Sequence, residues 1–325
     1  MDALTSLLHE VRSDGALFSR NILVPPWSVR FADGTSLTLV TMLRGDGWVV
    51  PGDAAPVALG AGDVAVVVGA EPFTIADTAD PPASPLYVVH GPDLCTTADG
   101  AEISDELVLG LRTCGNSLDG PTVLLTGSYR VGGRVSERLL SALPRVLAVR
   151  HDGRPGPVLD LAATEIERNA PGQQAVLDRL LDLLLLSTLR EWFTRPEAAS
   201  PGWYQALGDP VAGKALRLIH DRPARPWTVA ALAEETGVSR ATFARRFSDL
   251  VGQPPMAYLT DWRLALAADL LARTDATVES IARQVGYRSA FGLSVAFHRV
   301  YGTRPGHHRT STARATAGVG DDRRG

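Results

Sequence analysis

The chain has 325 residues, of which 45% are hydrophobic, a formal net charge of −4 and two cysteines. This length and apolar content allow two domains with cores of their own, and two cysteines are too few for a disulfide framework. The sequence shows neither a signal peptide nor a membrane span, so we expect a protein of the reducing cytoplasm.

Short β-forming runs separated by Gly, Pro and Asp turns characterise the chain up to about residue 155. The runs cover residues 37–43, 48–50, 56–59, 64–68 and 86–89. Their spacing is typical of a small antiparallel barrel. We therefore predict an α+β multidomain chain in which residues 1–155 form a β-barrel and helices follow.

One segment of this region resembles a motif of the cupin barrels. In GDVAVVVGAEPFTI, residues 62–75, Gly-Asp opens a strand as it does in the second cupin motif, but Phe73 stands where the family has a metal-binding His. None of the seven histidines lies in residues 36–76. Since a metal needs convergent His and carboxylate ligands, we expect no metal and no other cofactor. The stretch LLHEVRSDGALFSRNILVPPWSVRF also resembles the entry to a cupin-type sensor domain.

A metal-free barrel can still hold a small ligand in its mouth. Four aromatic residues are the candidates to line such a cavity: Trp27, Trp48, Phe73 and Tyr87. The alternative is that they fill the core, which is the more frequent role of aromatic residues in a small barrel. The sequence does not name the effector.

The two cysteines lie in turn-like segments, where exposure is plausible. Cys95 and Cys114 are therefore candidate redox sensors, since an exposed thiol can respond to oxidants when its thiolate is stabilised. No Arg or His flanks Cys95, and only Arg112 lies near Cys114. Inert or weakly reactive thiols are the alternative.

A helical hairpin is predicted over residues 156–200. Its helices cover residues 160–169 and 173–193, with Pro171-Gly172 between them. The second helix is apolar on more than one face and must be buried against something. Four charged residues, Asp178, Arg179, Asp182 and Arg190, interrupt it and argue against a membrane span.

An internal repeat dominates the C-terminal third, because one pattern of apolar residues, Gly and Pro occurs twice about fifty residues apart. The first copy reads Trp227, Leu232, Ala233, Gly237, Ser239, Phe243, Phe247, Gly252, Pro255. The second reads Val278, Ile281, Ala282, Gly286, Ser289, Leu293, Phe297, Gly302, Pro305. Both copies share the spacing Phe-x4-Gly-x2-Pro, which makes coincidence unlikely.

Each copy has the signature of a helix-turn-helix. In the first copy, Ala233 lets two helices approach closely, Gly237 can take a positive φ at the end of the first helix, and Ser239 can cap the second. Phe243 and Phe247 lie four residues apart and face inward. The second copy repeats these residue types, so we predict that both copies present the opposite face of their second helix to DNA.

The segments WTVAALAEETGVSRATFARRFSDLVGQPPMAYLTDWRLALAADLL and SIARQVGYRSAFGLSVAFHRVYGTRPGHHR resemble the DNA-binding domain of AraC-type transcription regulators. The resemblance implies two helix-turn-helix units joined by a long helix, here residues 256–273, whose second helices enter successive major-groove segments of double-stranded promoter DNA. Such segments repeat about every 34 Å, which requires a rigid connector. The resemblance also implies RNA polymerase as a partner and a homodimer formed through the hairpin, with packing of the hairpin against the barrel as the alternative.

The distribution of charge supports DNA binding by residues 201–310. They hold 14 Lys and Arg against 9 Asp and Glu, a net charge of +5, while the whole chain is −4. A basic module can bind phosphates, and an acidic partner domain cannot. Residues 311–325 are expected to be a disordered tail.

Candidate DNA contacts lie on or beside the second helix of each copy. They are Arg240, Ala241, Thr242, Ala244, Arg245, Arg246, Arg288, Ser289, Ala290, Phe291, Ser294 and Arg299. Arg245 is the first choice to read a guanine edge, while Arg240 and Arg246 are expected to hold phosphates. The second copy has Phe291, Ser294 and Val295 at the corresponding positions, so we expect thymine-methyl contacts, shape readout or backbone contacts there.

No catalytic constellation is present in the sequence, which contains no nucleophile elbow, phosphate-binding loop or CxxC pair. We predict a sequence-specific transcription regulator, not an enzyme, that is controlled by a small molecule or an oxidant sensed in the barrel. The alternatives are an architectural DNA-binding protein without an effector and a cupin-fold enzyme tethered to DNA.

Overall fold

The computed structural model describes residues 11–12, 18–91, 94–110, 112–131, 133–151, 153, 156–168, 170–195, 198 and 200–311. Most of the predicted tail and part of the N-terminal cupin-like stretch lie outside these residues. The chain divides into two compact units. Among the described residues, the first unit, which we call the β unit, contains those within 11–131 and 140–198, and the second, the helical unit, contains 133–139 and 200–311.

The larger of two sheets in the β unit follows the order β11-β12-β2-β13-β4-β7-β14, with β1 paired to β13. Its strands are β1 (Val11–Arg12), β2 (Phe18–Leu23), β4 (Leu37–Arg44), β7 (Val64–Val68), β11 (Val108–Gly110), β12 (Thr113–Gly115), β13 (Thr122–Val131) and β14 (Val146–Val149). All pairs are antiparallel except β12 with β2, which is parallel. Strand β7, sequence VAVVV, lies between β4 and β14 and is buried along its whole length, as a strand covered on both faces should be.

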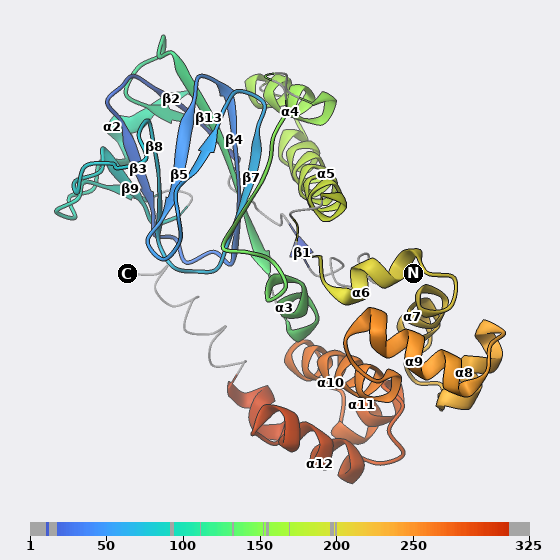
Figure 1. Ribbon diagram of the computed structural model, residues 1–325. Coiled ribbons are helices and arrows are strands. Elements are labelled where there is room, and N and C mark those ends of the chain that lie inside the picture. Colours follow the sequence, from blue (N-terminus) through green and yellow to red (C-terminus); the bar gives the residue numbers. More distant parts are fainter. Residues whose placement is uncertain are drawn as a thin grey trace. The chain divides into compact units, whose positions relative to one another are not determined.

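The second sheet follows the order β10-β9-β3-β8-β5-β6. Its strands are β3 (Ser28–Phe31), β5 (Gly47–Pro51), β6 (Val57–Leu59), β8 (Phe73–Ala76), β9 (Tyr87–Val89) and β10 (Cys95–Thr96), and a short helix α2 (Ser104–Leu107) follows. The two sheets enclose one apolar core (Figure 1). Every strand predicted from the sequence is present, but the parallel pairs β12-β2 and β3-β9 show that the unit is not purely antiparallel as expected.

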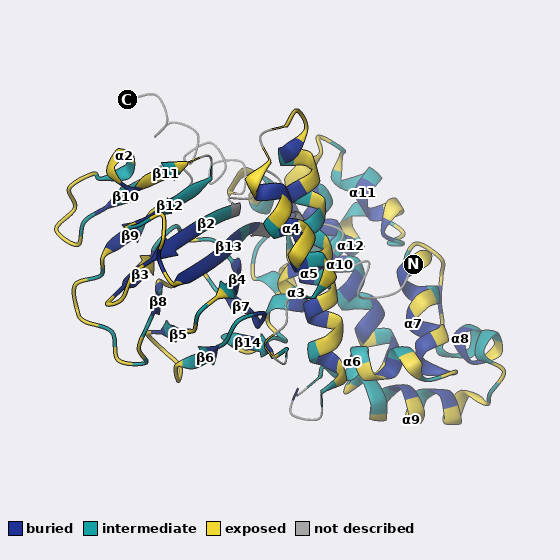
Figure 2. Cartoon of the chain, turned by 90° about the horizontal axis from the view of Figure 1, so that it is seen from above, coloured by how far each residue is buried: buried dark blue, intermediate teal, exposed yellow. Residues whose placement is uncertain are grey.

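The predicted helical hairpin is confirmed as α4 (Pro157–Glu167) and α5 (Gln173–Thr194). One face of α5 packs on β7 and β14 of the larger sheet. The Tyr129 hydroxyl on β13 donates a hydrogen bond of 2.6 Å to the Leu181 carbonyl oxygen, and a Cβ on Gly127 would lie 2.6 Å from the Leu181 side chain. One face of α5 therefore packs against the sheet, which is the alternative to dimerisation given above. The opposite face of α5 is exposed (Figure 2).

The helical unit contains the repeat. Its helices are α3 (Arg134–Leu140, of which residues 134–139 belong to this unit), α6 (Gly202–Gln205), the 3-10 turn η1 (Ala206–Gly208), α7 (Ala212–Asp221), α8 (Val229–Thr236), α9 (Arg240–Val251), α10 (Pro255–Arg273), α11 (Val278–Gln284) and α12 (Ala290–Tyr301). Residues 305–311 are also helical. The connecting helix α10 begins one residue before the predicted start, and its 19 residues give a length of about 28 Å.

Candidate DNA interface and ligand pocket

The first helix-turn-helix consists of α8 and α9, and the local sequence explains its turn. Gly237 ends α8 with φ of 74°, and the Ser239 hydroxyl accepts a hydrogen bond from the Thr242 amide at the start of α9. Phe243 and Phe247 are fully buried with ring centroids 5.7 Å apart. The predicted turn, cap and inward face are thus confirmed.

The second helix-turn-helix, α11 and α12, repeats this geometry. Gly286 has φ of 89°, and the Ser289 hydroxyl accepts from the Gly292 amide. Leu293 and Phe297 are fully buried in a core formed with α10 and α11. One further contact was not anticipated: the Glu279 carboxylate on α11 accepts a hydrogen bond of 2.8 Å from the Ala290 amide, which fixes the start of α12.

The outward faces of α9 and α12 differ in chemistry. On α9, Arg240, Ala241, Thr242 and Arg245 are exposed and Ala244 is half-buried. On α12, Phe291 is 79% exposed and Val295 55% exposed. Among the described residues none forms an ion pair with Arg240, Arg245 or Arg288. Arg288 and Arg299 are exposed beside α12, whereas the Ser294 hydroxyl donates to the Ala290 carbonyl oxygen at 2.7 Å.

Arg246 differs from the other arginines of α9 because it is paired within the chain. Its Nε and Nη2 both donate to Oδ2 of Asp209, at 2.9 and 2.6 Å. Burial alone would raise the pKa of Asp209, but hydrogen bonds from Arg246, Ala212 and Val211 and the Arg246 charge lower it below its usual value. The Arg246 charge is thus neutralised by a carboxylate, which the sequence reasoning did not foresee.

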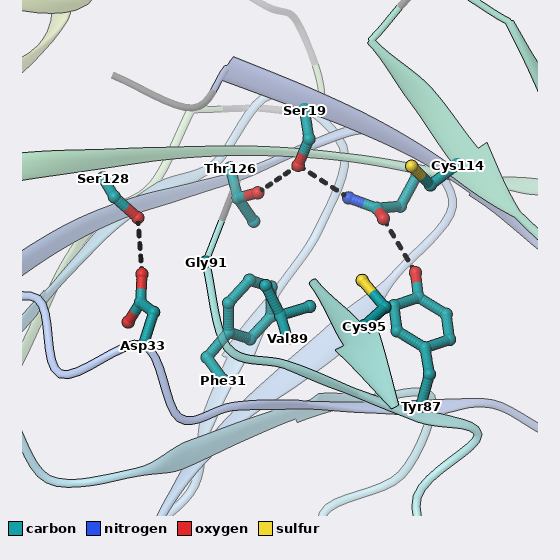
Figure 3. Close-up of a pocket in the computed structure, with 11 residues that line it drawn as sticks. Ser19, Phe31, Asp33, Tyr87, Val89, Gly91, Cys95, Cys114, Thr126 and Ser128 are labelled. Carbon is teal, nitrogen blue, oxygen red and sulfur yellow. Dashed lines mark hydrogen bonds between the residues drawn. The ribbon is translucent and has the colours of Figure 1, made fainter. Parts of the chain in front are cut away.

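The β unit contains a small pocket between its two sheets, with a cavity volume of about 40 Å³. Its lining is shown in Figure 3. Its lining residues are Ser19, Asn21, Phe31, Asp33, Tyr87, Val89, Gly91, Cys95, Cys114, Thr126 and Ser128. Of the four aromatic candidates, Tyr87 lines it. Trp27 and Phe73 are buried in the core, where Phe73 stacks on Phe31 with ring centroids 5.1 Å apart, and Trp48 is half-buried.

The polar wall of the pocket consists of hydrogen-bonded side chains, most of them on the larger sheet. The Tyr87 hydroxyl donates to Asn21 Oδ1 at 2.7 Å, and Asn21 Nδ2 donates to Ser19 Oγ at 3.3 Å. Ser19 Oγ lies 2.8 Å from Thr126 Oγ1. At the other end Ser128 donates to the Asp33 carboxylate at 3.2 Å. Phe31 and Val89 of the smaller sheet supply the apolar wall (Figure 3).

Both cysteines lie on the pocket wall, from different sheets. Cys95 belongs to β10 and Cys114 to β12, and both are free thiols of intermediate exposure. Burial, with a smaller contribution from Cys114, raises the pKa of Cys95 to about 11. Burial also raises the pKa of Cys114. Both thiols are therefore protonated at neutral pH, and protonated thiols react slowly with oxidants.

The sequence contained a signal for this pocket that we did not use. Thr126 and Ser128 lie two positions apart along β13, and Ser19 and Asn21 lie two positions apart along β2. Small polar residues at i and i+2 of a strand point to one face. Such pairs are the pattern to expect where a barrel interior binds a ligand.

Neither a metal centre nor a membrane span emerges from the described residues. Within them, no three His, Cys, Asp or Glu side chains are grouped closely enough to hold a metal ion. None of the helices described there is both long and apolar enough to cross a bilayer. At the cupin-like motif, the Asp63 carboxylate instead accepts hydrogen bonds from the Gly60 and His151 amides at 2.9 and 2.8 Å, so its role is structural.

Comparison with known proteins finds matches in both parts of the chain. A profile described as Cupin matches residues 2–194, and one described as Helix-turn-helix domain matches residues 232–311. The chain is 33% identical, over 95% of its length and 98% of the relative's, to a "Putative AraC-like transcription regulator" from Streptomyces lividans. It is 26% identical, over 95% of its length and 99% of the relative's, to the "HTH-type transcriptional regulator AlkR" of Acinetobacter baylyi.

Among solved structures, the DNA-binding domain of AdpA in complex with a target DNA is 30% identical. The match covers 31% of this chain and 91% of that one, with a TM-score of 0.30. The full-length relatives, the two matched profiles and the duplicated helix-turn-helix agree with one another. The chain belongs to the AraC-type, DNA-binding transcription regulators that carry an N-terminal cupin domain.

Proposed function

We propose that the protein binds promoter DNA sequence-specifically through both helix-turn-helix units. The observation that carries this proposal is the exposed, unpaired Arg245 on α9, on the face opposite the buried Phe243 and Phe247. A guanidinium in the major groove can bind guanine through two hydrogen bonds. Arg240 and Arg288 are also exposed and form no ion pair among the described residues, which supports their assignment to phosphates.

In this proposal α12 makes apolar contacts. Phe291 and Val295 are among the most exposed large hydrophobic side chains in the described chain. A thymine methyl group is the apolar feature of the major groove. We therefore assign A·T pairs to the second unit and a guanine to the first, with Ser289, Ala290, Ser294 and Arg299 beside the DNA backbone.

The β unit is proposed to bind the effector in the pocket described above. Asp33 is the one acidic side chain among the described residues that line it, and none of these residues is Lys, Arg or His. A carboxylate or phosphate ligand would enter without a counter-charge, which is costly in a partly buried site. The pocket therefore favours a small uncharged or cationic molecule that combines an apolar face with hydrogen-bonding groups.

Oxidant sensing by Cys95 and Cys114 is the second candidate, because both thiols lie on one pocket. Their raised pKa values count against it. We therefore place ligand binding first. Under this assignment iodoacetamide modifies the full chain slowly at neutral pH, whereas rapid modification would favour oxidant sensing.

The ligand proposal is tested with a library of small fragments sorted by charge, measured by thermal shift of the full chain. Hits should be uncharged or cationic. They should disappear in Val89→Phe, which narrows the pocket, and persist in Val57→Phe, an equally half-buried valine of the same sheet outside the pocket. A hit list dominated by carboxylates, or hits that survive Val89→Phe, would refute the pocket assignment.

We further propose that the protein is a homodimer joined through α5. Val176 and Leu183 are 44% and 46% exposed, and Leu180 between them is half-buried. Positions i, i+4 and i+7 form one stripe on a helix, so these residues make an apolar seam on the face that does not pack on the sheet. Light scattering should give two chains for the wild type and one for Leu183→Asp, while Leu118→Asp, which changes an exposed leucine outside α5, stays dimeric.

The remaining assignments follow from regulation at a promoter. We propose a regulator that acts in the cytoplasm, contacts RNA polymerase and has no enzymatic activity. Within it, residues 1–155 sense, residues 156–200 dimerise and residues 201–310 read DNA. The effector acts by changing the spacing or freedom of the two reading helices, so by linkage the effector and DNA must each alter the other's affinity.

A further inference from the structure

Helix α3 belongs to the helical unit although the sequence places it inside the β region. Residues 133–139 cluster with residues 200–311, while the chain on either side, ending at residue 131 and resuming at residue 140, belongs to the β unit. The sequence analysis did not predict this helix. Val135 and Leu139, four residues apart, are buried, as are the apolar positions of an amphipathic helix.

The N-terminus of α3 is capped by a carboxylate from α10. Asp269, which is 8% exposed, accepts hydrogen bonds from the backbone amides of Arg134 at 2.6 Å and Val135 at 3.2 Å. Gly133 precedes them with φ of 90°, and a Cβ there would lie 2.6 Å from the Asp269 carboxylate. Only glycine therefore fits at this position, and Figure 1 shows α3 beside α10.

Two arginines of α3 contact aromatic rings, one on the connecting helix α10 and one at the end of α12. The Arg138 guanidinium lies 5.3 Å from the ring centroid of Tyr258, which packs edge-on against Phe247 of α9. The Arg134 guanidinium lies 5.3 Å from the ring centroid of Tyr301, the last residue of α12. A cation over an aromatic face is attracted by the ring quadrupole. Helix α3 therefore contacts structure tied to both reading helices.

We propose that α3 is a clamp that fixes the spacing between α9 and α12, with Asp269, Arg134 and Arg138 as its positioning residues. The inference rests on the proposed reading of DNA by both units. The clamp lowers the entropic cost of fixing the two helix-turn-helix units on one face of the DNA. It also makes DNA binding sensitive to the distance between the two DNA segments that these units read.

The clamp also has a covalent link to the ligand pocket. Thr126 and Ser128, which line the pocket, lie on β13, and the chain runs from the end of β13 at residue 131 into α3. In the sequence, two residues separate the end of β13 from the start of α3. A ligand that shifts β13 therefore acts on α3 through this short connection. This gives the effector a route to the spacing of the reading helices without any contact between ligand and DNA.

The test uses the full chain and an operator obtained by selection from random DNA, with a second operator that carries one extra base pair between the two segments. Wild type should bind the lengthened operator much more weakly. Arg134→Ala with Arg138→Ala should lose roughly five- to thirtyfold on the native operator, as expected for two cation–π contacts. The further loss of affinity that the extra base pair causes should be smaller for this double variant than for the wild type.

Three further variants separate clamping from folding. Asp269→Asn should reduce the penalty for the extra base pair and should speed hydrogen exchange at the Arg134 and Val135 amides. The pair Arg134→Lys with Arg138→Lys, which keeps both cations, should restore most of the wild-type penalty. Arg150→Ala, which removes an exposed arginine of the β unit, should behave as wild type.

Each outcome has one meaning. If wild type tolerates the extra base pair, reading by both units fails. If wild type is sensitive and the folded double alanine variant and Asp269→Asn are equally sensitive, the clamp is refuted while the proposed function stands. If Arg134→Lys with Arg138→Lys does not restore the loss of affinity caused by the extra base pair, the charges over the two rings are not what positions α3. The positioning role assigned to the two arginines is then wrong.

Discussion

The two helix-turn-helix units share one backbone and differ in the chemistry they expose. Both have a serine N-cap, a left-handed glycine in the turn and two buried apolar residues four positions apart. Outside that frame, α9 exposes Arg240 and Arg245, whereas α12 exposes Phe291 and Val295. The shared residues thus determine the backbone geometry of both units. The exposed residues of α9 and α12 can differ without changing that geometry, so the two helices can recognise different bases.

The turn glycines provide the largest expected difference between the units. A Cβ on Gly286 would lie 2.9 Å from the Ala224 backbone and 2.7 Å from Arg263, whereas a Cβ on Gly237 meets nothing within 4 Å. Both have positive φ, so Gly237→Ala should cost about 1–2 kcal/mol from backbone strain alone. Gly286→Ala adds overpacking and should cost about 4 kcal/mol. Urea denaturation of the full chain measures both, and equal losses would contradict the account.

Replacement of Arg245 should break direct readout by the first unit. Arg245→Ala should cost about 1–3 kcal/mol at one G·C pair of the operator and relax the preference at that position. Binding measurements on operators with each base pair replaced in turn will show this. A loss of the same size on every operator would make Arg245 a phosphate contact instead.

Replacement of Phe291 should have a smaller effect of a different kind. Phe291→Ala should cost about 1 kcal/mol, since it removes apolar contact area without leaving a buried polar group unpaired. The loss should disappear on an operator in which uracil, which lacks the methyl group, replaces thymine in the second segment. A loss that persists there would exclude the thymine-methyl contact.

The salt dependence of binding should distinguish two arginines of α9. Arg240→Ala should lower the slope of log affinity against log salt by about 1, because a phosphate contact releases counterions. Arg246→Ala should leave the slope unchanged, since its charge is neutralised by Asp209. Binding titrations at several salt concentrations measure both slopes. If Arg246→Ala lowers the slope as well, the ion pair opens on DNA.

The same ion pair gives the smallest expected effect. The pKa of Asp209 is lowered in the folded chain, so its contribution to stability is present above the unfolded carboxyl pKa of about 3.9 and is lost as pH falls through the folded value. Asp209→Asn should destabilise the helical unit by about 0.2–1 kcal/mol at pH 7, and the difference should vanish in strong acid. Denaturation at the two pH values checks this, and a difference that grows in acid would contradict it.

The repeat was predictable from sequence because local chemistry determines it: glycine at a positive φ, serine at a cap and apolar residues at helical spacing. Strands β4, β5, β6, β7 and β9 followed from their turn residues for the same reason, whereas β8 was not predicted. Helix α3 was missed because its cap, Asp269, lies more than 130 residues away in the sequence. The Arg246–Asp209 pair and the pocket also depend on residues distant in sequence, which no local pattern identifies.

Sequencing of genomic fragments bound by the full chain at two salt concentrations tests the central claim most directly, with Arg245→Ala run in parallel. The account predicts discrete sites that persist at the higher salt, share a G·C pair at one position in wild type and lose that preference in the variant. Binding spread over all fragments and abolished by salt would contradict it and would favour an architectural DNA-binding protein.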